Sequence, residues 1–181
     1  KLMDAATLDR ALDPLGMTQT DFSVNDSQKT PDFALPYELK DDVVKKVAFR
    51  NIDNIGPAGS INSNIEDMTK WLMVQLGKGT FQGKKLIGES TLTDMHTPHM
   101  ATGSRADQEE PEISPASYGM GWFVQPYRGH YWVRHGGAID GFVAAVSFFP
   151  NDGVGIVALV NMRRTGLTEL GTRHAADRIL G

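Results

Sequence analysis

The residues with the clearest chemical potential form one short segment, in which His135 is followed directly by Gly136 and Gly137. The segment ends a run of aromatic and β-branched residues that is typical of a strand. Glycine lets a ligand approach the backbone closely and leaves amide groups exposed. An exposed amide beside an imidazole suits acyl transfer, because the amide stabilises a developing oxyanion and the imidazole handles protons or charge. The spacing alone also fits a glycine-rich turn with an incidental histidine, so both interpretations stay open.

Other candidate groups are less specific. His96 and His99 have a spacing that can hold a metal on a helix, with Asp94 nearby, but Pro98 lies between them and disrupts that geometry. We therefore predict no metal site. The sequence contains no cysteine, which excludes disulfides, thiolate catalysis and cysteine-based zinc sites. His174 is predicted to be a surface or packing residue.

Large aromatic residues near the segment have two interpretations. Trp71, Trp122 and Trp132 are predicted to lie in the core. Trp132 or Tyr131, close to His135, has the alternative role of lining a substrate cleft. The acidic stretch around Glu109 is predicted to be a mobile loop, either simply solvated or acting as a lid.

The elements that must position these groups begin with helices. Apolar residues recur at three- and four-residue spacing from Asp4 to Leu15, which predicts a helix closed by Pro14 and Gly16. Residues 18–51 lack a sustained period and indicate a long surface loop with short strands. Ser63 and Glu66 form a capping box ahead of a second helix, which Gly77 and Gly79 end. A short helix is expected over residues 90–96, before Pro98.

The second half of the sequence is typical of strands. We predict strands over residues 118–124, 130–134, 142–149 and 154–161, and a hairpin turn at residues 150–153. The run from Val154 to Val160 is nearly all apolar, so this strand is expected to be buried on both faces. Residues 167–180 are predicted to form a terminal helix with one face packed on the sheet.

Composition narrows the classes of partner. The net charge is −4, and we interpret the basic cluster Arg163-Arg164, which follows a strand-like run, as a solvated strand end. We therefore expect no binding to nucleic acid. No apolar run reaches the ~18 residues that a membrane-spanning helix needs, and we expect no membrane span.

Several segments, in the same order, resemble the serine β-lactamase and penicillin-binding protein superfamily. The segment at His135 is similar to its third active-site motif, where class C enzymes have Lys-Thr-Gly and related esterases and D-aminopeptidases often have His-x-Gly. Four other segments are similar: the Pro-Leu-Gly-Met turn at residues 14–17, the Ser-Thr-x-Glu-Asp-Met-x-x-Trp helix within 59–71, the Tyr-Gly-x-Gly-Trp strand at 118–122, and the Gly-Phe to Asn strands over 141–161. Together these segments span nearly the whole chain.

The resemblance implies an α+β fold in which an antiparallel sheet is flanked by helices. Residues 1–112 would form a segment of a helical lobe with connecting loops, and residues 113–181 the C-terminal strands and terminal helix of a sheet lobe. It implies catalytic roles for His135, Gly137 and Ala138, with the Ala138 amide as one oxyanion donor. Gly136 and Trp132 would bind substrate. No cofactor is implied.

The histidine in place of lysine affects the expected substrate. Imidazole titrates near neutral pH, so its charge is conditional. This weakens the expectation of a β-lactam or peptide carboxylate and favours esterase, amidase or D-aminopeptidase-like substrates. The partner is expected to be a small-molecule acyl substrate: an ester, an amide or a β-lactam.

Two motifs of the superfamily are missing. No serine is followed three positions later by lysine, and no tyrosine has asparagine two positions on. Because both motifs precede the Pro-Leu-Gly-Met turn in the superfamily, we interpret the chain as a C-terminal fragment that is inactive alone. It would pair with the N-terminal half of the same protein or with another copy. The alternative is a non-catalytic binding or interaction domain that reuses the fold. The resemblance favours a periplasmic or secreted location.

Overall fold

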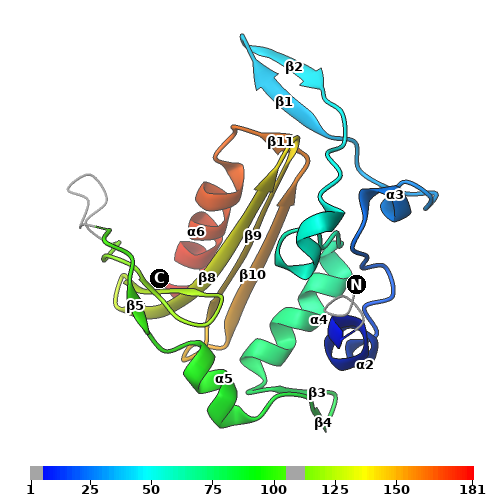
Figure 1. Cartoon of the computed structure of the whole chain (residues 1–181). Coiled ribbons are helices and arrows are strands. Elements are labelled where there is room, and N and C mark those ends of the chain that lie inside the picture. Colours follow the sequence, from blue (N-terminus) through cyan, green and yellow to red (C-terminus); the bar gives the residue numbers. More distant parts are fainter. Residues whose placement is uncertain (1–5, 105–112) are drawn as a thin grey trace. The chain divides into compact units, whose positions relative to one another are not determined.

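A computed structural model describes residues 6–104 and 113–181, and it has the predicted α+β fold with mainly antiparallel sheets (Figure 1). Two stretches lie outside the described residues: the start of the first predicted helix and the acidic loop around Glu109. The elements in chain order are η1 (Leu8–Leu12), α2 (Asp13–Leu15), α3 (Val24–Ser27), β1 (Tyr37–Lys40), β2 (Val43–Lys46), η2 (Asp53–Ala58), α4 (Ile65–Leu76), β3 (Thr80–Phe81), β4 (Lys84–Lys85), α5 (Glu89–Met95), β5 (Met100–Ala101), β6 (Ser117–Tyr118), β7 (Phe123–Tyr127), β8 (His130–Ile139), β9 (Phe142–Phe149), β10 (Val154–Val160), β11 (Met162–Arg163) and α6 (Leu167–Leu180).

The described chain forms two compact units, each built from three segments. The first contains the residues up to Trp71, Gly136–Ala145 and Val157–Gly171. The second contains Leu72–His135, Val146–Ile156 and Thr172–Gly181. The predicted division into a helical lobe (residues 1–112) and a sheet lobe (residues 113–181) describes the superfamily fold, and it stays a prediction. Within the described ranges, no helix is long and apolar enough to cross a membrane.

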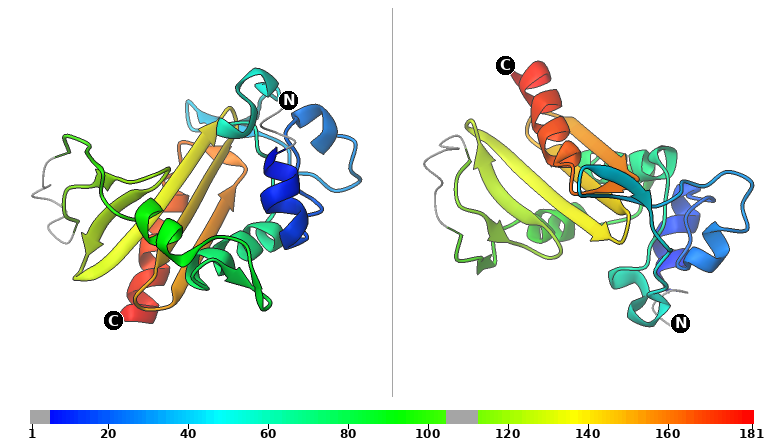
Figure 2. Two further views of the ribbon diagram at one scale, coloured as in Figure 1. Left: turned by 60° about the horizontal axis from the view of Figure 1, so that its bottom comes forward. Right: turned by 90° about the horizontal axis from the view of Figure 1, so that it is seen from above.

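The largest sheet has the strand order β10-β9-β8-β7-β6-β5. In the second unit, helix α6 lies along one face of it (Figures 1 and 2). Ala176 and Leu180 of this helix pack in one cluster with Tyr127, Trp132 and Phe149. The predicted terminal helix and its packing on the sheet are therefore confirmed.

Side chains of strand β10 alternate between its two faces, and each face packs against a different helix. Val154 and Ile156 pack against the cluster that includes α6. A side chain at Gly155 would lie 2.6 Å from Cδ2 of Leu72 on helix α4, so α4 covers the other face. The prediction that β10 is buried on both faces is confirmed only in part, because a helix covers each face but the side chains of this edge strand are partly buried.

The first unit holds a smaller sheet with the order β11-β1-β2. Strand β1 pairs in parallel with β11, with Tyr37 opposite Met162. The Asn161 side chain donates a hydrogen bond to the carbonyl of Leu35 at 3.0 Å. Short strands were expected between residues 18 and 51, and β1 and β2 confirm them, whereas the short helix α3 in this stretch was not predicted.

Helix α4 confirms the predicted second helix, but its N-cap is one residue later than expected. The side chain of Asn64 accepts a hydrogen bond from the Asp67 amide at 2.9 Å, and the helix starts at Ile65. The Ser63 hydroxyl instead lies 2.8 Å from the Thr20 hydroxyl. The capping-box prediction for Ser63 is therefore wrong, because that side chain is used in a tertiary contact.

Asp67 joins α4 to the turn that follows α2. Its buried carboxylate accepts hydrogen bonds from the Gln19 amide, the Thr20 hydroxyl and the Lys70 ammonium, at 2.8–2.9 Å. Burial disfavours the charged form, but these donors outweigh it and hold the pKa of Asp67 below its usual value. Lys70 also donates to the carbonyl of Gly16, which has a left-handed backbone and ends α2.

The strand predicted over residues 118–124 is wrong, because the chain reverses inside it. Tyr118 of β6 pairs with Phe123 of β7 across a tight turn. Gly121 has φ +81°, a backbone conformation that glycine adopts without steric cost. A side chain at Gly119 would lie 2.4 Å from the carbonyl oxygen of Met95. These two glycines therefore make a turn that an alternating pattern does not reveal.

Several local predictions are confirmed. The turn at residues 150–153 contains a 3.1 Å hydrogen bond from the Asp152 amide to the Phe149 carbonyl. Helix α5 agrees with the short helix expected before Pro98. Trp122 and Trp132 are buried, at 6% and 2% exposure, whereas Trp71 is only half-buried.

Candidate functional site

Strand β8 presents the predicted site residues in a row. It runs from His130 to Ile139, so His135 and the two glycines lie within an extended strand rather than after its end. The glycine-rich turn is therefore wrong as an interpretation of this segment, because its backbone is paired in the ladder beside β9. Trp132 and Val133 in the first half of the strand are buried, while all four residues from His135 to Ala138 are exposed. The site segment is the solvent-facing end of a strand anchored in the core.

The side chain of His135 has aromatic neighbours in the second unit. Its Nε2 lies 3.1 Å from the hydroxyl of Tyr118 on β6, and its ring centroid is 5.7 Å from that of Phe123. A phenol can donate to a neutral imidazole nitrogen, and a protonated imidazole can donate to the phenol oxygen. Tyr118 therefore holds the orientation of the imidazole in either charge state.

The two glycines differ in the room around them. A side chain at Gly137 would have no heavy atom within 4 Å, and one at Gly136 would lie 3.4 Å from the carbonyl oxygen of Ala144. Neither has a positive φ. The space over Gly137 is thus open to solvent, which is what close approach of a substrate requires.

Trp132 lies in the core rather than in a cleft. It is 2% exposed, its indole Nε1 donates to the hydroxyl of Ser147, and its ring is stacked on Phe149 at a centroid distance of 6.2 Å. The structure therefore contradicts the predicted substrate contact and confirms the core interpretation. Burial of the indole in the core fixes the position of β8.

The turn after β8 is fixed by close packing in the first unit. Gly141 has φ +79°, and a side chain there would lie 2.2 Å from Cβ of Pro36. The Tyr37 amide donates to the carbonyl of Gly141 at 3.4 Å. A tight turn at this point needs glycine for both conformation and space.

Asp140, in the same turn, binds two arginines. Its Oδ2 lies 2.8 Å from Nε of Arg50, and its Oδ1 lies 3.5 Å from Nη1 of Arg163. The sequence did not identify this cluster, because Arg50 and Asp140 are far apart in the chain and follow no shared motif. The interpretation of Arg163 as merely solvated is incomplete, since Arg163 is one of the two arginines that pair with Asp140.

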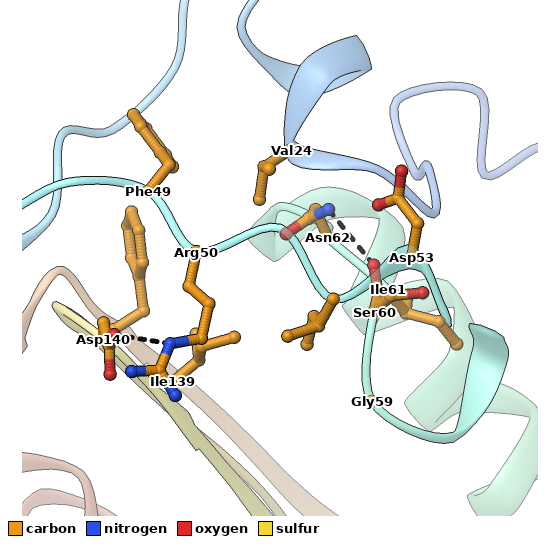
Figure 3. A pocket seen from close by; sticks show the side chains of 12 residues that line it. Val24, Phe49, Arg50, Asp53, Gly59, Ser60, Ile61, Asn62, Ile139 and Asp140 are labelled. Carbon is orange, nitrogen blue, oxygen red and sulfur yellow. Dashed lines mark hydrogen bonds and ion pairs between the residues drawn. The ribbon is translucent and has the colours of Figure 1, made fainter. Parts of the chain in front are cut away.

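A cavity of about 60 Å³ lies beside this cluster (Figure 3). Ile139, Asp140 and Phe142 line it from the β8–β9 turn, and Arg50 reaches toward Asp140 across it. On its far side the Asn62 amide donates to the carbonyl of Ser60 at 3.1 Å. Ile139, the residue that follows Ala138, is therefore part of the cavity wall.

His96 and His99 have separate structural roles. His96 Nε2 is 2.9 Å from Oε1 of buried Gln75, while His99 Nε2 is 2.9 Å from the carbonyl of Asp94. Among the residues that the structure describes, no group of three metal-ligating side chains is present. His174 is exposed, as the surface interpretation predicts.

The groups on this strand are of the types that polarise an acyl group, but the motifs for nucleophilic attack are missing from the sequence. The strand offers exposed amides, an imidazole and a nearby phenol, which suit an oxyanion and proton transfer. Tyr118 and Phe123 were not predicted as site residues. Their contact with His135 depends on the pairing of β6, β7 and β8, which no local pattern specifies.

Comparisons with known proteins agree with the fold. The model of the beta-lactamase family matches residues 3–178. Unguisins hydrolase ungD' from Aspergillus campestris (strain IBT 28561) is 26% identical over 151 residues, covering 82% of this chain and 27% of that protein. The chain thus spans just over a quarter of this curated relative.

Two solved structures share the fold. The octameric penicillin-binding protein homologue from Pyrococcus abyssi has a TM-score of 0.79 and 20% identity, with coverage of 97% of this chain and 37% of that one. The D-amino acid amidase from Ochrobactrum anthropi SV3, complexed with L-phenylalanine amide, has a TM-score of 0.70 and 19% identity, with coverage of 99% and 50%.

Proposed function

Because this chain belongs to the beta-lactamase family, we propose that it is the C-terminal part of a hydrolase that acts through an acyl-serine intermediate. A serine attacks the carbonyl of an ester, amide or β-lactam, the leaving group departs, and water releases the acyl group. No serine here is followed three positions later by lysine. In this proposal the nucleophile comes from residues outside this sequence, and the chain alone is inactive.

One observation carries the proposal: the exposed segment from His135 to Ala138 follows directly on a strand segment that Trp132 and Val133 anchor in the core. The Ala138 amide serves as one oxyanion donor, and open space over Gly137 lets the substrate carbonyl reach it. His135, held by Tyr118, transfers a proton or stabilises negative charge. Gly136 binds substrate through its backbone. An oxyanion donor and an imidazole on one strand suit the hydrolysis of amides and esters.

The edge position of β10 supports the proposal that another segment completes the sheet. Unpaired strand edges readily take further strands. We assign this edge to the N-terminal half of the same protein, with a second copy of the chain as the competing occupant. Freely exchanging β10 amides in a monomer that gains no protection from the upstream half would contradict this pairing.

Covalent labelling tests the proposed reaction. The isolated chain and the chain joined to its upstream residues are treated with a fluorophosphonate or a fluorescent penicillin, and turnover of a chromogenic ester is recorded. We expect labelling and turnover only in the joined protein, with turnover reduced by His135→Ala. Labelling of the isolated chain would contradict the proposal, and so would full turnover by the joined His135→Ala variant. A joined protein that binds small molecules but is never labelled would favour the non-catalytic alternative.

A further inference from the structure

Two adjoining hollows of the first unit form one groove. The 60 Å³ cavity beside Asp140 shares Val24 and Phe49 with a larger hollow of about 460 Å³. The larger hollow is also lined by apolar side chains such as Phe33 and Leu35. Its volume is in the range of small-molecule sites. Figure 3 shows Phe49 at the border of the smaller cavity. We call these two hollows together the aromatic groove.

Three phenylalanines connect the groove to the β8–β9 turn. The ring of Phe33 lies 6.1 Å from that of Phe49, and the ring of Phe49 lies 5.8 Å from that of Phe142, measured between centroids. Phe33 is 39% exposed, so its ring is available to a ligand. Centroid distances of this size are those of interacting aromatic pairs. An aromatic ring or a large aliphatic group of a ligand would extend this row of three phenylalanine rings.

The groove contains two permanent cations. Arg50 and Lys46 line it, and two carboxylates in its lining, Asp140 and Asp53, balance their charge. Arg163, which lines neither hollow, shares Asp140 with Arg50. The carboxylate of Asp53 already accepts hydrogen bonds from Ser23 and Asn51.

Arg50 is the cation best placed to receive an anion. Its side chain is 62% exposed, and it contacts Asp140 through Nε. Arginine binds carboxylates through two parallel hydrogen bonds and keeps its charge at all relevant pH values. Arg50 is thus a fixed cation for a substrate carboxylate.

We propose that the aromatic groove binds a substrate that has both a large apolar side group and a carboxylate, of the type of an N-acyl aromatic amino acid. The side group extends the series of Phe33 and Phe49, and the carboxylate pairs with Arg50. The role of the groove in substrate specificity rests on the proposed function, whereas binding to the groove needs no nucleophile. The groove would favour acyl substrates with these two features over small neutral ones.

Binding to the chain tests the inference without catalysis. The ¹⁵N-labelled chain is titrated with N-acetylphenylalanine, its neutral carboxamide, and N-acetylalanine, and the amide shifts of residues 46–50 are followed. We expect N-acetylphenylalanine to bind at least about tenfold more tightly than either comparison compound, since burial of a phenyl ring and a charge-assisted pair each contribute at this scale. Equal affinity for all three compounds, or shifts confined to other residues, would overturn the inference.

Matched variants assign the two contacts. Arg50→Gln should weaken N-acetylphenylalanine about tenfold and leave its carboxamide unchanged. Arg128→Gln is the control, because Arg128 is also a half-exposed arginine paired with one aspartate, Asp177. Phe33→Ala should weaken both phenylalanine compounds, while Leu170→Ala, which truncates an exposed apolar side chain on α6, should not. Loss of affinity in the controls as well would refute the groove.

The two proposals fail separately. If the joined protein is never acylated but the chain binds N-acetylphenylalanine as predicted, only the proposed reaction is wrong. If the joined protein is acylated but the groove variants change neither affinity nor the preference among the three compounds, only the groove is wrong.

Discussion

Buried His96 should make the fold sensitive to mild acid. It is 7% exposed, and its ring lies edge-on to Phe148 and Trp122, with centroid distances of 5.0 Å and 5.9 Å. Burial lowers the pKa of His96 from 6.5 to about 4. The neutral ring is therefore the form that the folded chain keeps, with its Nε2 hydrogen-bonded to Gln75.

The direction of the effect follows from proton binding. Between pH 6.5 and about 4 the unfolded chain protonates His96, while the folded chain does not. The stabilising contribution is fully present above pH 6.5 and is lost as the pH falls toward 4. At about 1.4 kcal/mol for each pH unit, the total loss is about 3 kcal/mol, a substantial part of the stability of an ordinary domain.

Urea unfolding at a series of pH values between 7.5 and 4 measures this contribution. We expect the free energy of unfolding of the unmodified chain to fall more steeply than that of His96→Gln, whose amide can still bond to Gln75 but does not titrate. His174→Gln is the control, because His174 is exposed on α6. Parallel curves for the unmodified chain and His96→Gln would refute the reasoning.

Three further substitutions have clear expectations. Gly137→Ala should leave the thermal midpoint unchanged, since no atom lies within 4 Å, yet lower turnover in the joined hydrolase about tenfold or more by obstructing the acyl group. Asp67→Asn should destabilise the chain by about 2 kcal/mol in urea unfolding, because Gln19, Thr20 and Lys70 no longer donate to a buried carboxylate; Asp26→Asn, in an exposed pair of the same spacing, should not change the midpoint. Gly141→Ala should lower the thermal midpoint more than Gly129→Ala, since both have positive φ but only the first meets a proline; equal effects would exclude that clash.

Local patterns predicted the helices and the later strands well, because capping, periodicity and turn chemistry act over a few residues. Where tertiary contacts decide, prediction failed. Two glycines weaken the strand pattern at residues 136–137, yet pairing in the sheet keeps β8 extended through them. Ser63 has the local features of a cap, but its hydroxyl bonds to Thr20 and the neighbouring Asn64 caps the helix.

The candidate site was predictable only in part. His135 and its glycines were found because they are contiguous and the superfamily resemblance gave them meaning. Tyr118 reaches His135 through the registers of two strand pairs, and Arg50 meets Asp140 from a distant part of the chain. Contacts of this kind depend on topology, which no short pattern contains.

The parallel pairing of β1 with β11 has a consequence for how the protein is made. The hydrogen bond between Leu35 and Asn161 closes a loop of 126 residues. Non-local contacts of this kind slow folding, because chain entropy is lost before the contact forms. During synthesis at about 5–20 residues per second, the β1–β2 hairpin emerges well before its partner strand exists. We therefore expect the small sheet to be the last part of the first unit to protect its amides in a refolding experiment followed by hydrogen exchange.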